Sequence, residues 1–149
     1  MRTNLALLTI AAIIIVGCGK EKEQPFTPEK AGYAGTVTVI YQETAFDNEG
    51  IVVDFDPSDD GKTASLTIHK IKFVPQMPVT IDVTIPDIDI TVSGRTTLLS
   101  KDIVVPLAMG GEYPRYTVTG LTGRIEGEEI SFSLKFGDYP TFFTGTRQH

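Results

Sequence analysis

The sequence predicts an all-β fold, a single antiparallel up-and-down β-barrel of about eight or nine strands. Apolar and polar residues alternate with a period of two from Tyr33 onward, which is typical of strands with one buried face. No later segment keeps apolar residues at helical spacing without Gly, Pro or a β-branched run interrupting it, so we expect little or no helix. The alternation also slips by one residue at two places, and such slips bend strands as a closing barrel requires.

Runs of this alternation mark the strands in order, and the clearest is ISFSLKF at residues 130–136. Turn-forming pairs separate most of the runs, namely Asp60-Gly61, Ser93-Gly94, Gly110-Gly111 and Gly137-Asp138. The predicted strands lie near residues 33–42, 50–56, 62–73, 79–85, 88–93, 96–107, 115–121, 128–136 and 141–147.

The two slips favour a barrel over a two-sheet sandwich, because they supply curvature. One slip lies between Ile68 and Ile71, where the buried face changes parity. The other lies between Ile85 and Ile88, on either side of Pro86. Proline lacks the N–H that a strand ladder needs, so we expect a bulge or a strand break at Pro86.

Residues 1–17 have the composition of a lipoprotein signal peptide. The run LALLTIAAIIIV, Leu5–Val16, is uncharged and follows Arg2 and the amino terminus. It is shorter than the roughly 20 apolar residues that a membrane-spanning helix needs. We therefore expect this segment to be removed.

Cys18 is the only cysteine, so it has no partner in the chain for a disulfide. The preceding residues, Ile15-Val16-Gly17, complete a sequence that resembles the bacterial lipobox, at which diacylglycerol is attached to the cysteine sulfur before cleavage. The alternative is a free or buried thiol that follows an apolar stretch. We expect Cys18 to be the lipidated first residue of the mature protein, held on the membrane by its acyl chains.

Residues 18–32 are expected to form the lipidated cysteine and a flexible tether rich in charge and proline, and residues 33–149 the barrel domain. Residues 18–149 carry 12 Lys and Arg against 19 Asp and Glu, a formal charge of −7. This acidity argues against a nucleic-acid partner and against electrostatic binding to anionic lipid. We therefore expect the lipid anchor to attach the protein to the cell envelope, at the outer membrane. The sequence is compatible with either the periplasmic or the surface side of that membrane.

Several segments follow the lipobox and tether in a characteristic order: YAGTVTV, SLTIHKIKF, MPVTIDVTIPDI, YTVTGLTGRIEGEEISFSLKF and FFTGTRQ. In these segments the chain resembles the calycin-like lipoproteins of Bacteroidota, from about Tyr33 to the end. The resemblance implies a lipocalin-like up-and-down barrel and no particular activity. Lipocalins proper carry a Gly-x-Trp signature, and this chain has no Trp, which argues against a standard lipocalin ligand.

Six aromatic residues share faces with aliphatic neighbours and are the candidate ligand-binding residues: Tyr41, Phe55, Phe73, Tyr116, Phe132 and Phe136. An eight-stranded barrel is either filled by its side chains or holds one small ligand. The first hypothesis is that a small apolar ligand or lipid enters the barrel mouth and is oriented by Tyr hydroxyls. The alternative is a structural or protein-interaction lipoprotein with a filled barrel and an exposed apolar loop patch around Phe73, Met77, Tyr113 or Tyr116.

We expect no enzyme activity and no cofactor. His69 and His149 are the only histidines, and the only thiol is assigned to the lipid, so nucleophilic catalysis has few candidate groups. A hydrolase that uses carboxylates alone is a third hypothesis, and it requires two facing carboxylates in a cleft.

The acidic turn DPSDDG has the spacing of the first half of a calcium loop, with Asp56, Ser58 and Asp60 as candidate ligands. The twelfth position of that loop is Thr67, where a bidentate Glu is needed. We therefore expect a solvated turn here, with calcium as the alternative.

Overall fold

The computed structural model describes residues 26–149, so the predicted signal peptide and Cys18 lie outside the described residues. The all-β prediction is confirmed, and the only helical element in this part of the chain is a short 3-10 turn, Pro114–Tyr116. The strands are β1 (Ala31–Tyr41), β2 (Thr44–Pro57), β3 (Thr63–Ile71), β4 (Ile81–Ser93), β5 (Thr96–Val104), β6 (Leu107–Ala108), β7 (Gly111–Glu112), β8 (Val118–Glu126), β9 (Glu129–Phe136) and β10 (Tyr139–Arg147).

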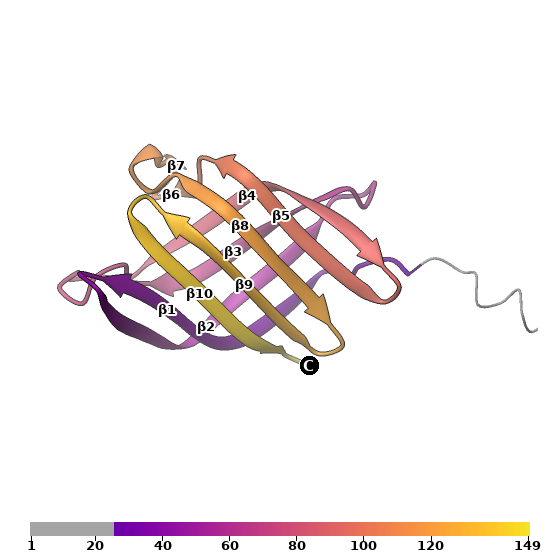
Figure 1. Cartoon of the computed structure of the whole chain (residues 1–149), viewed down its shortest axis with the longest axis horizontal. Helices are drawn as coiled ribbons and strands as arrows, with labels where there is room; N and C mark the ends of the chain where they lie inside the picture. The colour runs from indigo at the N-terminus through magenta and orange to yellow at the C-terminus, as the bar shows by residue number, and fades with distance from the viewer. Residues whose placement is uncertain (1–25) are drawn as a thin grey trace, which may run out of the picture.

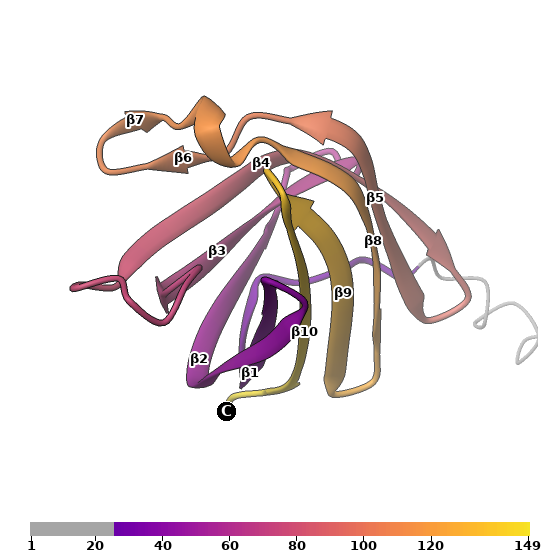
Figure 2. The ribbon, with the colours of Figure 1, turned by 60° about the vertical axis from the view of Figure 1, so that its left-hand side comes forward.

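The eight long strands form a closed antiparallel barrel (Figure 1). Each pairs with the next long strand along the chain, and β1 pairs with β10 to complete the circle. The β6–β7 hairpin lies between β5 and β8 in sequence and projects from one side of the barrel (Figure 2). It is attached through β6, where Ala108 pairs with Val83 of β4. The fold is therefore an up-and-down barrel with one small insertion.

Both predicted parity slips are bulges. On β3 the pairing with β4 shifts between Ile68 and Ile71, and Lys70 takes a φ of +60°. On β4 the extra residues lie beside Pro86, and Asp87 takes a φ of +57°. The strand continues through this bulge, so the two predicted strands 79–85 and 88–93 are one strand, β4.

Two further bulges were not predicted. Gly50 has a φ of +68° where the pairing of β1 with β2 shifts, and Gly120 has a φ of +62° where the pairing of β8 with β9 shifts. The predicted strand 50–56 is only the second half of β2, which begins at Thr44. A two-residue turn at Gln42 and Glu43 precedes it, without a glycine or asparagine to signal the turn.

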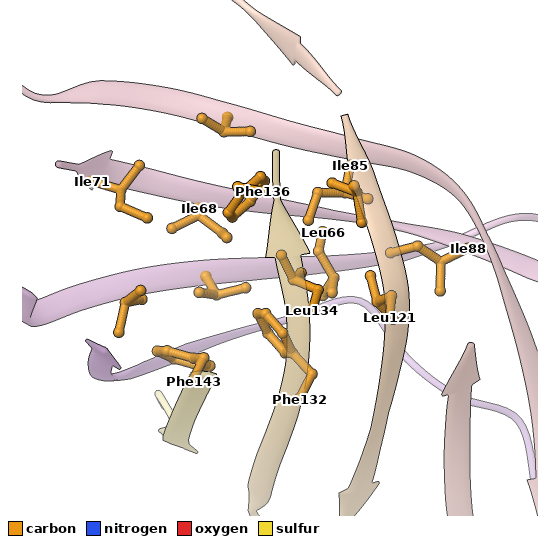
Figure 3. Close-up of a cluster of buried hydrophobic side chains, with 14 of the residues drawn as sticks. Leu66, Ile68, Ile71, Ile85, Ile88, Leu121, Phe132, Leu134, Phe136 and Phe143 are labelled. Atoms are coloured by element: carbon orange, nitrogen blue, oxygen red, sulfur yellow. The ribbon is translucent and has the colours of Figure 1, made fainter. Parts of the chain in front are cut away.

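The barrel interior is filled by its own side chains. Inward-facing residues of β3, β4, β8 and β9 point toward one another, including Leu66, Ile85, Leu121 and Phe136 (Figure 3). Each of these four has at most 1% of its surface accessible, so their side chains pack closely against one another. Such packing is typical of protein cores and leaves the two ends of the barrel as the places where a ligand could enter the interior.

Candidate functional site

The connections divide between two ends of the barrel. The capped end carries the β1–β2 turn, the β3–β4 loop, the segment 105–117 and the β9–β10 turn. The open end carries the β2–β3, β4–β5 and β8–β9 turns and both ends of the described chain. The backbone N–H of Gln148 donates to the carbonyl oxygen of Gly32 at 2.8 Å, so the chain ends lie together there.

An aromatic cluster closes the capped end. The Phe73 ring stacks on Tyr116 at a centroid distance of 4.2 Å and meets Phe136 edge-on at 5.0 Å. Tyr139 stacks behind Phe73 at 6.5 Å, and Tyr41 lies 6.1 Å from Tyr139. Aromatic pairs at such distances attract one another in addition to the area that they bury. The cluster therefore seals this end.

The β3–β4 loop that carries Phe73 is held in place by polar contacts. The Asn48 side chain of β2 accepts a hydrogen bond from the Lys72 N–H at 2.9 Å and donates one to the Lys72 carbonyl at 3.0 Å. The Phe73 N–H donates to the Met77 sulfur at 3.1 Å. Asn48 is buried, and these two bonds account for its presence on the inward face.

At the open end lies a cavity of about 490 Å³, which we call the mouth hollow. Its buried residues are Tyr33, Phe55 and Thr97, joined by the half-buried Ile125. Its outer lining includes Phe26, Pro28, Glu29, Arg95, Glu126, Glu128 and Arg147. The mouth hollow thus has a largely apolar floor and a charged rim.

The segment before β1 lies across the rim of the mouth hollow. The guanidinium of Arg95, in the β4–β5 turn, lies 5.1 Å from the centre of the Phe26 ring, within the range of a cation–π contact. The Arg147 guanidinium of β10 lies 3.3 Å from the Glu29 carboxylate. Two separate contacts therefore connect residues 26–30 to the barrel.

Two buried residues that line the mouth hollow carry hydroxyl groups. Tyr33 is 2% exposed and Thr97 is 1% exposed, and neither hydroxyl has a hydrogen-bond partner among residues 26–149. Burial raises the pKa of Tyr33, an effect that Arg147 opposes and Glu128 reinforces, so the phenol keeps its proton and can donate. Buried polar groups are nearly always paired, and these two are positioned to bond a molecule in the hollow.

The six candidate ligand-binding residues lie in different places. Phe55 lines the mouth hollow. Phe73, Tyr116, Phe136 and Tyr41 belong to the cluster that closes the capped end, where Phe73 and Phe136 are fully buried. Phe132 packs in the core beside Phe143, at a centroid distance of 5.3 Å. The structure does not bring the six together around one cavity.

The exposed apolar patch near the capped end consists of other residues than those expected under the alternative hypothesis. Phe73 has no accessible surface, and Met77, Tyr113 and Tyr116 pack against the core. Burial also raises the pKa of Tyr116. The expectation that Phe73 is exposed is wrong, because it fills the capped end of the barrel. The exposed apolar side chains near that end are Val79, Ile103, Leu107 and Met109.

The acidic turn forms its own hydrogen bonds. The Asp60 carboxylate accepts from the Ser58 hydroxyl at 2.6 Å and from the Lys62 N–H at 2.9 Å, and the first of these bonds contributes most to lowering the pKa of Asp60. Asp56 lies at the end of β2, before this turn. In the described part of the chain, no three His, Cys, Asp or Glu side chains are grouped as ligands of a metal ion.

His69 bridges three neighbouring strands. Its Nε2 lies 2.8 Å from Asp54 of β2, and its Nδ1 lies 3.3 Å from Asp82 of β4. The hydrogen bond with Asp54 contributes most to raising the pKa of His69. Asp82 also accepts the N–H of Lys70, which the β3 bulge frees, and this bond contributes most to lowering the pKa of Asp82. Each ring nitrogen of His69 therefore lies beside a carboxylate. The Asp82 carboxylate also holds the β3 bulge in place through its hydrogen bond with the Lys70 N–H.

Sequence reasoning missed the residues of the mouth hollow other than Phe55. Tyr33 and Thr97 lie near the open ends of β1 and β5, and Arg95 follows the predicted Ser93-Gly94 turn. Their positions near strand ends were an available signal, since an up-and-down barrel brings alternate connections to the same end.

No helix among residues 26–149 is long and apolar enough to span a membrane. Comparisons of the chain with protein-family models, curated proteins and solved structures found no match.

Proposed function

We propose that this chain is a membrane-anchored bacterial lipoprotein of calycin-like fold that binds a small apolar or amphiphilic molecule, such as a lipid, in the mouth hollow. The observation that carries the proposal is the pair of buried hydroxyls of Tyr33 and Thr97, which line the hollow without a partner among the described residues. A bound molecule with one polar group would satisfy both.

The lining of the hollow suits an amphiphile. The apolar part would lie against Phe26, Phe55 and Ile125, and its polar group would lie at the two hydroxyls. Arg95 and Arg147 are already engaged with Phe26 and Glu29, so the rim requires no charged ligand. Apolar lining with a few convergent polar groups is the usual composition of a small-molecule site.

A lipid anchor on Cys18 is compatible with a ligand site in the mouth hollow, at the open end of the barrel. Cys18 lies eight residues before Phe26, and a fully extended chain of that length spans at most about 29 Å. A lipid on Cys18 would hold the open end of the barrel close to the bilayer surface. A hydrophobic ligand could then pass between the membrane and the mouth hollow over a short distance.

Native mass spectrometry of the protein, isolated in mild detergent from the cells that make it, tests the proposal. We expect extra mass that leaves on denaturation, and less of it in the variants Tyr33→Phe and Thr97→Val, which remove only the hydroxyls. Tyr139→Phe, at the capped end, is the matched control and should retain the ligand. A native mass equal to the denatured mass, or equal retention in all three variants, would contradict the proposal.

A second candidate function is protein interaction by a filled barrel. The observation in its favour is the exposure of Val79, Ile103, Leu107 and Met109, which are 39–69% accessible and lie toward the capped end. The test is a photo-crosslinking side chain at position 109 in living cells. A discrete crosslinked species that is absent with the same side chain at position 59, in the β2–β3 turn, would support this function.

A further inference from the structure

The outer wall of the barrel carries a groove that shares only Glu126 with the mouth hollow. Two adjoining cavities of about 550 and 450 Å³ lie on the outside of strands β1, β10, β9, β8 and β5, which stand side by side in the barrel wall (Figure 1). The two cavities share Arg124, Ser131 and Thr144. We call the combined surface the outer groove.

Three glycines line the outer groove. Strand alternation places Gly35, Gly123 and Gly145 on the inward face, two residues from the buried Tyr33, Leu121 and Phe143 respectively. A Cβ on Gly35 would lie 1.9 Å from the Thr144 carbonyl oxygen, and one on Gly123 would lie 2.5 Å from the Phe132 Cβ. The neighbouring backbone and side chains therefore leave no room for a Cβ at these positions.

The outer groove changes character along its length. One end is apolar, between the side chains of Leu98 and Phe142, which are 41% and 46% exposed, with Phe132 beneath them. The other end is polar and carries Arg124, two glutamates and the hydroxyls of threonine and serine residues on three strands. Exposed phenylalanine beside a row of hydroxyls offers both a flat apolar surface and many hydrogen-bonding groups.

The polar end holds an unfavourable charge arrangement. Glu126 of β8 and Glu129 of β9 are direct cross-strand partners, and like charges in such a position destabilise a sheet. Arg124 lies 2.9 Å from the Glu126 carboxylate, which leaves the pair of glutamates with one cation. The groove therefore keeps a slight excess of acceptors, which repels anions and favours ligands that donate hydrogen bonds.

We propose that the outer groove binds a neutral glycan. One sugar of a chain can lay its apolar face on Phe142. Hydroxyls of sugars further along β10, toward Thr146, can donate to Glu126 and Glu129 and accept from Arg124. Two adjoining cavities suit a chain of sugars better than one compact molecule. Both cavities are open along one side, so a polymer can enter without threading its end.

Glycan-array binding followed by titration calorimetry tests this proposal on the full-length protein, with neutral hexasaccharides such as chitohexaose and mannohexaose as soluble probes. We expect binding to neutral glycans that weakens about tenfold or more in Phe142→Ala. Ile103→Ala, an exposed apolar residue of β5 outside the groove, is the matched control and should bind normally.

Glu129→Gln separates a binding role from a structural one. It removes the like-charge repulsion, so the melting temperature should stay equal or rise while glycan affinity falls. Tyr33→Phe should leave glycan binding unchanged, which keeps this test independent of the mouth hollow. The proposal is overturned if no neutral glycan binds, if Phe142→Ala binds as well as the natural chain, or if acidic glycans or extended peptides alone show the Phe142 dependence.

Discussion

Gln42 and Glu43 adopt a backbone conformation that neither residue favours. Their φ angles are +52° and +65°, so the β1–β2 hairpin has the two consecutive positive values of a type I′ turn. Glycine and asparagine dominate such turns because a Cβ in the left-handed region meets the carbonyl oxygen. The hairpin therefore forms because β1 and β2 pair along their length, in spite of the turn sequence.

Glu43→Gly should stabilise the protein by roughly 0.5–1 kcal/mol, because relief of the left-handed strain exceeds the added entropy of the unfolded chain. The measurement is the free energy of unfolding from a urea titration. Asp138→Gly is the control, since Asp138 is the second residue of the β9–β10 turn and its φ is not positive. It should destabilise the protein, and equal effects of the two changes would contradict the assignment of strain to Glu43.

At the scale of strands, the parity of apolar residues predicted two of the four bulges. The slips at Lys70 and Asp87 were visible because isoleucines lie on both sides of each. The bulge at Gly50 was hidden, because the inward residue before it is the polar Asn48, whose burial depends on bonds to the distant Lys72. The local pattern of apolar residues cannot indicate a hydrogen-bond partner that lies 24 residues away in the sequence.

Gly35 tests how closely the strands approach. Gly35→Ala should lower the free energy of unfolding by about 3 kcal/mol, because its Cβ would overlap the Thr144 carbonyl oxygen and β10 would have to move. Gly111→Ala is the matched control, since nothing lies within 4 Å of its Cβ position and its φ is not positive. Chemical denaturation of both variants measures the difference. A cost at Gly35 no larger than at Gly111 would contradict the close crossing.

The His69 bridge between β2, β3 and β4 should make stability depend on pH. The folded protein raises the pKa of His69 above its ordinary value of 6.5, so its stabilising effect is fully present below about pH 6.5 and is lost as pH rises through the folded-state value. Asp82 has a lowered pKa, so its own contribution is lost only in acid. Both groups are partly exposed, which limits the effect to less than about 1 kcal/mol.

The variant His69→Gln measures this effect. Its loss of stability relative to the natural chain should be larger at pH 5.5 than at pH 8.5, as followed by urea titrations at both values. His149→Gln, at the far end of the chain, controls for the removal of a histidine. A pH-independent difference would show that the bridge acts by packing alone.

At the scale of the whole molecule, fold class was more predictable than the site. Alternation along each strand determines which residues face inward, and this local property together with its two slips was enough to predict a barrel of about eight or nine strands. The mouth hollow combines Phe26, Arg95 and Arg147 with Tyr33 and Thr97, residues brought together only when the barrel closes. No spacing in the sequence indicates that these residues lie together. The candidate ligand-binding residues were therefore chosen by aromatic character, and most of them lie in the core or at the capped end.

Cys18→Ser tests the membrane anchor. The serine oxygen cannot replace the sulfur as the lipid acceptor. The variant should therefore incorporate no labelled palmitate and should be absent from the membrane fraction. Metabolic labelling and cell fractionation measure both outcomes. Because the chain has one cysteine, retained label in the variant would place the lipid elsewhere and contradict the lipobox interpretation.

Pairing of β1 with β10 also bears on when the protein can fold. The first strand finds its second neighbour in the last nine residues of the barrel, Tyr139–Arg147, so a chain that lacks them leaves β1 and β9 with unpaired edges. Contacts of such long sequence separation form slowly. A chain synthesised from its amino terminus therefore cannot close the barrel until its last strand, β10, has been made.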